Sequence, residues 1–231
     1  MIEGSAQETT GLVRRGPALS LLGGLLAVAL LLAACGRPLP EQRLQGVVFD
    51  TGYHLTLHGD LDTPRLGVAI ESELARQAAA WSRFVEAQAR WQGARRLPGA
   101  RPPPPWPPVL GHAWLVDRLH ERLLAEGVET FLVEVGGIRR GRGAWPVALP
   151  GEDRRLTLED EALVSLVWHE PDGPHRLSVV ADGALAALAL AWRGRAAGVD
   201  GLSHPGAWVV TSPTGERLSE AMAARLGPTT E

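Results

Sequence analysis

Residues 127–143 read GVETFLVEVGGIRRGRG, and the expected class of fold follows from this stretch and its neighbours. Gly127 is the kind of residue that lies just past a helix C-terminus, so it ends a helix expected from His112 to Glu126. Thr130 to Val135 predicts a short strand. The glycines and arginines that follow predict an exposed turn.

The segments on either side mix strands and helices without strict alternation. Strands are expected over 46–57 (a pair, or one bent strand), 145–149, 155–158, 162–169, 177–181 and 207–211, and helices over 64–91, 184–197 and 217–226. Such a mixture predicts the α+β class, here a single domain in which a mixed sheet is packed with helices. Seven prolines between residues 97 and 108 predict an extended connector inside that domain, which would cover 46–231.

Composition excludes several functions. The 231 residues carry a formal net charge of -3, so no large positive field exists to hold a nucleic acid. All basic residues are arginines, which excludes a P-loop lysine and a Schiff base. The only cysteine, Cys35, excludes an internal disulfide.

The amino terminus has the order of features found in bacterial lipoproteins. Arg14 and Arg15 precede an apolar run over 19–34, which ends in small residues and Cys35. We expect residues 1–34 to be a signal peptide, Cys35 to be acylated, and residues 35–45 to be a tether. The protein would then be anchored to a bacterial membrane, facing the periplasm or the cell exterior. The alternative is an uncleaved N-terminal helix with a bystander cysteine.

Gly136 and Gly137, together with Arg139 and Arg140, are the best candidates for a binding site. Backbone N–H groups of glycines and guanidinium groups bind diphosphates. An exposed hairpin uses the same residue types, so this alternative stays open.

Other polar groups have simpler explanations. His54 and His58 predict a solvated pair on one strand face, and Asp172 and Asp200 lie beside glycines and predict turns. Acidic residues between 152 and 161 alternate with arginines and predict a solvated face.

The order of segments resembles the FAD:protein FMN transferases of the ApbE type, which have a T-fold-like domain. The resemblance rests on the lipoprotein signal, residues 51–57 (TGYHLTL), Val116-Asp117, residues 127–137 and residues 177–192. It implies an enzyme that cleaves FAD with the help of Mg2+ and attaches FMN to a Thr or Ser of flavoproteins, such as subunits of membrane redox complexes. It also implies that Thr51, Gly136, Gly137, Arg139 and Arg140 contact the cofactor.

The chain departs from the family at the residues that carry the chemistry. An acid and a lysine of the family are absent from residues 106–115, and the family's metal-binding Asp and Thr fall near Ala187 and Leu190. Asp182 or Asp200 would be a displaced metal ligand. The family also has a longer segment where this chain has its proline run.

These features together predict a shortened, degenerate, membrane-anchored relative of the flavin transferases with weak or absent activity, in which retention of FAD and Mg2+ is doubtful. The alternatives are a flavin-binding protein without turnover and an assembly partner of flavoprotein subunits. In the last case the interaction surface would be formed by exposed tryptophans, namely Trp81, Trp91, Trp106 and Trp114.

Overall fold

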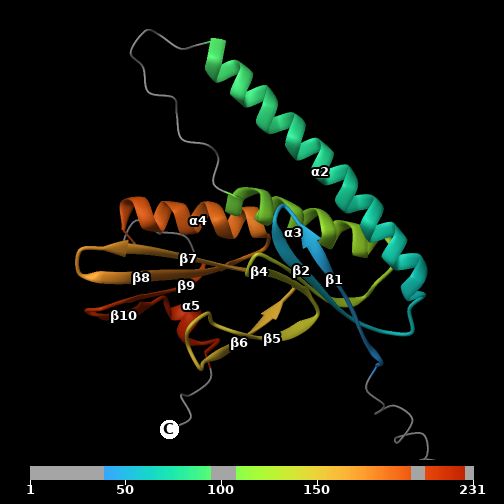
Figure 1. Cartoon of the computed structure of the whole chain (residues 1–231). Coiled ribbons are helices and arrows are strands. Elements are labelled where there is room, and N and C mark those ends of the chain that lie inside the picture. The colour runs from blue at the N-terminus through green and yellow to red at the C-terminus, as the bar shows by residue number, and fades with distance from the viewer. Residues whose placement is uncertain (1–38, 95–107, 199–205, 227–231) are drawn as a thin grey trace, which may run out of the picture. The chain divides into compact units, whose positions relative to one another are not determined.

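The computed structural model describes residues 39–94, 108–198 and 206–226 (Figure 1). Residues Pro40–Glu231 form one compact unit, which contains all the described helices and strands. The expected signal peptide, Cys35, Trp106 and Asp200 lie outside the described residues.

Ten strands and four helices make up the described part of this unit. In chain order they are β1 (Glu41–Val48), β2 (Thr51–His58), α2 (Thr63–Ala94), α3 (Pro108–Ala125), β3 (Thr130–Val135), β4 (Ile138–Arg142), β5 (Ala144–Ala148), β6 (Arg155–Glu159), β7 (Ala162–Glu170), β8 (Gly173–Ala181), α4 (Ala184–Ala197), β9 (Ala207–Ser212), β10 (Gly215–Leu218) and α5 (Glu220–Ala223).

The strands form an eight-stranded sheet in the order β1-β2-β3-β4-β7-β8-β9-β10, and β5 pairs with β6 in a separate hairpin. The α+β class is confirmed, but the sheet that we expected to be mixed is antiparallel at every pairing between described strands. Neighbouring strands are joined by tight turns or through helices, except that β4 and β7 are joined through the β5–β6 hairpin. The order ββ-helices-ββ therefore occurs twice, first with α2 and α3 and then with α4.

The sheet has a different apolar cover on each face because successive side chains of a strand alternate. Val164 and Val179 face the helices, whereas their neighbours Leu163 and Val180 face the β5–β6 hairpin and α5. Helices α3 and α4 lie against each other over the first face (Figure 1).

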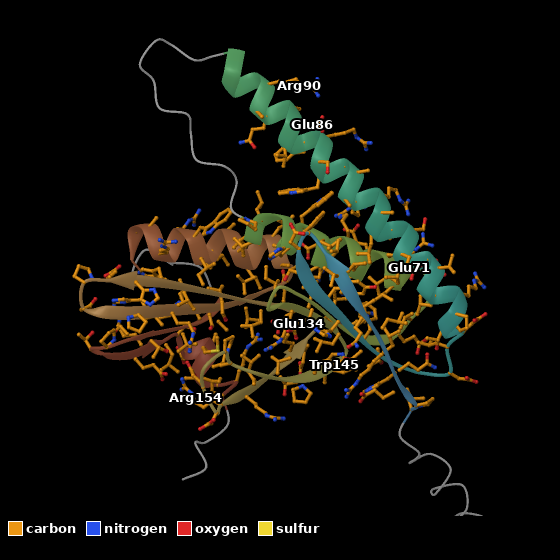
Figure 2. All side chains as sticks on the ribbon, viewed as in Figure 1. Glu71, Glu86, Arg90, Glu134, Trp145 and Arg154 are labelled. Carbon is orange, nitrogen blue, oxygen red and sulfur yellow. The ribbon has the colours of Figure 1, made fainter. Side chains whose placement is uncertain are left out.

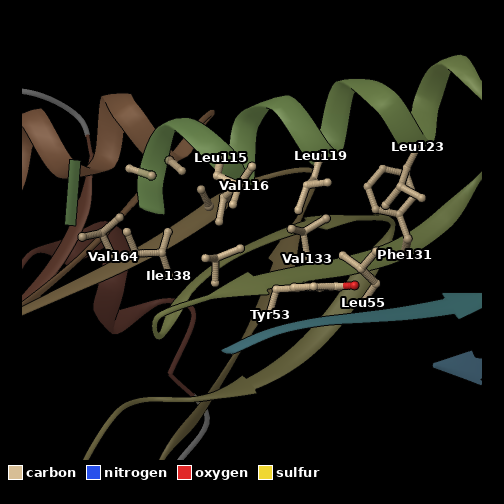
Figure 3. Close-up of a cluster of buried hydrophobic side chains, with 14 of the residues drawn as sticks. Tyr53, Leu55, Leu115, Val116, Leu119, Leu123, Phe131, Val133, Ile138 and Val164 are labelled. Atoms are coloured by element: carbon tan, nitrogen blue, oxygen red, sulfur yellow. The ribbon is translucent and has the colours of Figure 1, made fainter. Parts of the chain in front are cut away.

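Helix α3 forms the centre of the larger core (Figure 3). Its apolar side chains Leu115, Leu119 and Leu123 are fully buried and lie over Val133 and Phe131 of β3. Spacing of four residues places these leucines on one helix face. Each leucine contributes on the order of 2–5 kcal/mol, judged by the usual cost of truncating it.

Several boundaries differ from the sequence-based expectation. Helix α3 begins at Pro108 instead of His112, and strand β8 begins at Gly173 instead of Leu177. Residues 41–45, expected in the tether, belong to β1 because they pair with β2. The stretch Ile138–Arg142, expected as a turn, is strand β4 because it pairs with β3. The expected helix over 217–226 is shorter, since Gly215–Leu218 forms β10 and Ser219 caps α5 by accepting a hydrogen bond from the Met222 backbone nitrogen.

Helix α2 packs on the core through its first half only. Leu66, Ile70 and Leu74 are buried, whereas most residues after Trp81 are exposed. Figure 2 shows Glu86 and Arg90 on the part of α2 that lies away from the sheet. None of the described helices combines the length and apolar character needed to cross a bilayer.

Candidate functional site

Two hairpin turns at the same end of the sheet bring together several of the predicted residues. The β1–β2 turn consists of Phe49 and Asp50, both with positive φ, and is followed by Thr51. The β3–β4 turn consists of Gly136 and Gly137. The Gly136 backbone nitrogen donates a hydrogen bond to the Gly52 carbonyl oxygen at 3.3 Å. Thr51 and the glycine pair are therefore neighbours.

The two glycines of the second turn have different surroundings. Gly136 has φ +55°, and a Cβ there would lie 2.5 Å from Nδ1 of His112, so the histidine ring already fills the space above it. Gly137 has φ +83°, and a Cβ there would meet nothing within 4 Å. Burial lowers the pKa of His112, which therefore carries a neutral ring at pH 7. At the predicted diphosphate site, the space beside Gly137 is therefore free, whereas the His112 ring occupies the space beside Gly136.

The side chains of Arg139 and Arg140 have different partners. They are consecutive residues of a strand, so their side chains project to opposite faces of the sheet. Arg139 donates hydrogen bonds to Glu134 at 2.8 Å and to the Ala148 carbonyl at 2.7 Å. Arg140 donates to Asp117 at 2.6 Å on the helix face. The prediction that both arginines bind one diphosphate assumed that they lie in a loop. In strand β4 their side chains instead lie on opposite faces of the sheet.

Asp117 is the most engaged polar residue of the site. The residue is 7% exposed, and its carboxylate accepts hydrogen bonds from Arg140 and from the backbone nitrogens of Ala184 at 2.8 Å and Leu185 at 3.0 Å. Gly183, the N-cap of α4, has no side chain to cap the helix, so Asp117 supplies the acceptor from α3. Sequence reasoning marked the Val116-Asp117 pair without finding this role.

His120 lies three residues beyond Asp117 on α3 and is 5% exposed. Its ring meets Phe131 edge-on, with 5.0 Å between the ring centroids. Burial, with the nearby Arg140 charge, lowers its pKa to about 4, so the ring is neutral at pH 7.

An apolar groove of about 340 Å³ lies between helices α2, α3 and α4. Its lining consists of aromatic and aliphatic side chains from three helices: Ala80, Trp81, Phe84, Leu110, Trp114 and Leu185. The ring centroids of Trp81 and Trp114 are 5.8 Å apart, and Phe49 of the β1–β2 turn lies 6.0 Å from Trp81. Trp81 and Trp114, expected to be exposed, are half-buried here, and the side chain of Trp91 lies outside the described part of the chain.

Asp182 lies in a different cavity, of about 630 Å³, whose described lining includes neither Gly136 nor Gly137. Glu161 lines the same cavity but binds Arg225, with Oε1 2.8 Å from Nη2. At the family's metal positions, Leu190 lines this cavity and Ala187 is fully buried. Mg2+ usually keeps several water ligands and is held by one or two carboxylates together with substrate phosphates. Because Glu161 is bound to Arg225, and Ala187 and Leu190 offer no oxygen, Asp182 is the one carboxylate of this described lining without such a partner, which is a poor set of protein ligands.

Comparisons with known proteins agree on the fold. No family model matches the chain, and no curated protein matches it. Among solved structures, the chain is similar to a histidine-to-glycine mutant of the flavin transferase ApbE from Vibrio cholerae, with a TM-score of 0.59 and 17% identity, over 81% of this chain and 100% of that one. It is also similar to the apo form of the flavinyl transferase ApbE from Pseudomonas stutzeri, with a TM-score of 0.58 and 12% identity, over 83% and 99%.

Proposed function

We propose that this protein, which has the fold of the ApbE flavin transferases, is a lipid-anchored flavin-binding protein in which FMN transfer is weak or lost. The observation that carries the binding function is the apolar groove of Trp81 and Trp114 beside the hairpin turns of Thr51 and Gly137. A planar heterocycle such as a flavin ring binds to aromatic side chains by stacking.

The weak or lost transfer follows from the oxygen ligands. Without a well-held cation, the negative charge that develops on a diphosphate during cleavage loses several kcal/mol of stabilisation. The carboxylate of Asp117 already accepts hydrogen bonds from Arg140 and from the α4 backbone. Asp117 therefore stabilises the fold, and Asp182 lines another cavity.

Flavin binding is tested with the purified full chain in detergent micelles, titrated with FAD and with FMN while flavin fluorescence is recorded. Stacking on tryptophan quenches this fluorescence, so we expect saturable quenching. Trp114→Ala should weaken binding by at least about tenfold, equal to about 1.4 kcal/mol. Trp168→Ala, which changes a tryptophan of β7 outside the groove, is the matched control. Equal binding by both variants, or no quenching in the wild type, contradicts the proposal.

Loss of transfer is tested separately with FAD, Mg2+ and a flavoprotein acceptor domain. We expect no covalently fluorescent acceptor after denaturing electrophoresis, alongside a positive control with an active ApbE. A labelled acceptor would overturn the proposed loss while leaving flavin binding intact.

A second candidate function, that of an assembly partner, is favoured by the exposed half of α2. Phe84 and Val85 are 45% and 43% exposed on a helix that extends well beyond its packed half. A cross-linker placed at Glu86 would then capture a flavoprotein subunit from intact membranes. Capture that is unchanged when the cross-linker is moved to Glu121 on α3 contradicts this function.

A further inference from the structure

A cluster of three metal-binding residue types lies at the β7–β8 hairpin, away from the groove and the glycine turn. Within the described residues, Glu170, Asp172 and His175 each offer one ligand atom, and these atoms lie within 4.8 Å of one another. Nε2 of His175 is 2.8 Å from Oδ1 of Asp172 and 3.6 Å from Oε2 of Glu170. One imidazole nitrogen is therefore directed at two carboxylates.

The cluster is held in place by a neighbouring tryptophan. The His175 ring stacks on Trp168, with 5.6 Å between centroids and 20° between planes, and the His175 side chain is only 14% exposed. The Trp168 indole N–H donates to Oε1 of Glu170 at 2.8 Å, which leaves Oε2 directed at the histidine. Such outer contacts fix the orientation of metal ligands and raise metal affinity.

The distances fit a small transition-metal ion. Zinc binds histidine nitrogen and carboxylate oxygen at about 2.0–2.2 Å, which places tetrahedral ligands roughly 3.4 Å apart. The two distances from Nε2, 2.8 and 3.6 Å, lie on either side of this value.

We propose that Glu170, Asp172 and His175 form a binding site for a divalent transition-metal ion of the zinc type. The ion takes the position between Nε2 of His175 and Asp172, and the neutral imidazole then carries its proton on Nδ1. A fourth coordination position remains for water. Mixed imidazole and carboxylate ligands favour zinc, copper and nickel over magnesium and calcium, so this site differs in chemistry from a magnesium site.

The test is calorimetric titration of the untagged full chain in detergent with Zn2+, with and without excess Mg2+. We expect one equivalent to bind, with no competition from Mg2+. His175→Ala and Asp172→Asn should each weaken binding by at least about tenfold. His169→Gln is the matched control, because His169 precedes Glu170 on the same strand and is exposed but is not part of the cluster.

A second measurement is the midpoint of thermal unfolding. Zn2+ should raise it in the wild type and in His169→Gln, and should leave His175→Ala unchanged, because an ion that binds the folded state stabilises it. Absence of Zn2+ binding in the wild type overturns the proposal, as does equal binding by His175→Ala. Neither outcome bears on flavin binding, since the two sites share no residue.

Discussion

Asp117 satisfies donors from two elements, β4 and α4, with a single carboxylate. It receives Arg140 from β4 and two backbone N–H groups from the first turn of α4, and it is itself held on α3. Removing such a partner leaves a guanidinium and two N–H groups without an acceptor in a buried position. One side chain of α3 therefore links strand β4 to the first turn of α4.

We expect Asp117→Ala to lower the free energy of unfolding by about 3 kcal/mol, the usual cost of breaking a buried, hydrogen-bonded ion pair. Asp117→Asn keeps one acceptor oxygen and should cost about 1–2 kcal/mol. Glu121→Ala, which removes an exposed partner of Arg118 on the same helix, should cost about 0.5 kcal/mol or less. Urea denaturation followed by circular dichroism measures all three, and similar values for Asp117→Ala and Glu121→Ala would refute the assignment.

The buried His120 makes stability depend on pH. Its pKa is about 4 in the folded chain, against an ordinary histidine value of 6.5, so the unfolded chain binds a proton that the folded chain excludes. Stability is therefore full above pH 6.5, falls as the pH drops towards 4, and levels off below that. The loss is about 3 kcal/mol, and His112 adds to it because its pKa is lowered too.

The measurement is urea unfolding of the wild type and His120→Leu at several pH values between 4 and 7.5. The variant lacks the titrating ring, so its free energy of unfolding should change less steeply over this range. A wild type and variant with the same slope would show that His120 takes up its proton in the folded state.

At the residue scale, sequence reasoning located the important positions more reliably than it explained them. Asp117 and the glycine pair were marked, but Asp117 acts on Ala184, 67 residues away, and no local pattern reveals such a contact. The steric role of Gly136 depends on His112 in the same way. The sequence analysis placed Arg139 and Arg140 together in a turn because it missed strand β4, in which their side chains project to opposite faces of the sheet.

At the element scale, the strongest periodic segments were predicted with correct boundaries. Thr130–Val135 and Ala184–Ala197 match the expected strand and helix. Strand β4 was missed because Gly141 and three arginines are poor strand formers, and pairing with β3 overrides that preference. Likewise Arg217 and Leu218 of β10 were read as the start of a helix, although they pair with β9.

Helix α2 should respond to mutation differently along its length. Ile70→Ala removes a side chain that is 1% exposed, and we expect a loss of about 3 kcal/mol in the free energy of unfolding. Val85→Ala removes a 43% exposed side chain from the same helix and should cost about 0.5 kcal/mol or less. Chemical denaturation compares the two. Equal losses would mean that the second half of α2 is packed in solution.

At the scale of the whole molecule, the sequence predicted the α+β class and the resemblance to the flavin transferases, and the structural similarity confirms that fold. The double ββ-helices-ββ order was not foreseen, because its two copies share arrangement and no obvious sequence. Hairpins that are distant in the sequence pair through long-range contacts, and a short stretch of sequence does not reveal such contacts.

Attachment to a membrane is a property of the whole chain that remains a prediction. Cys35→Ala should abolish acylation and move the protein from the membrane fraction to the soluble fraction, because acyl chains supply about 0.8 kcal/mol per buried methylene. Fractionation followed by mass spectrometry of the amino-terminal peptide measures both effects. An unmodified Cys35 in a membrane-bound wild type would favour the uncleaved N-terminal helix.

The contact between Asp117 and Ala184 also bears on biogenesis. The carboxylate is synthesised 67 residues before the helix whose first turn it caps. A ribosome adding roughly 5–20 residues per second therefore exposes this acceptor several seconds ahead of its donors. Arg140 follows Asp117 after only 23 residues, so it can bind the carboxylate during that interval. Docking of α4 then becomes a late step, and a nascent chain that stalls before residue 184 would present an unfinished surface to chaperones.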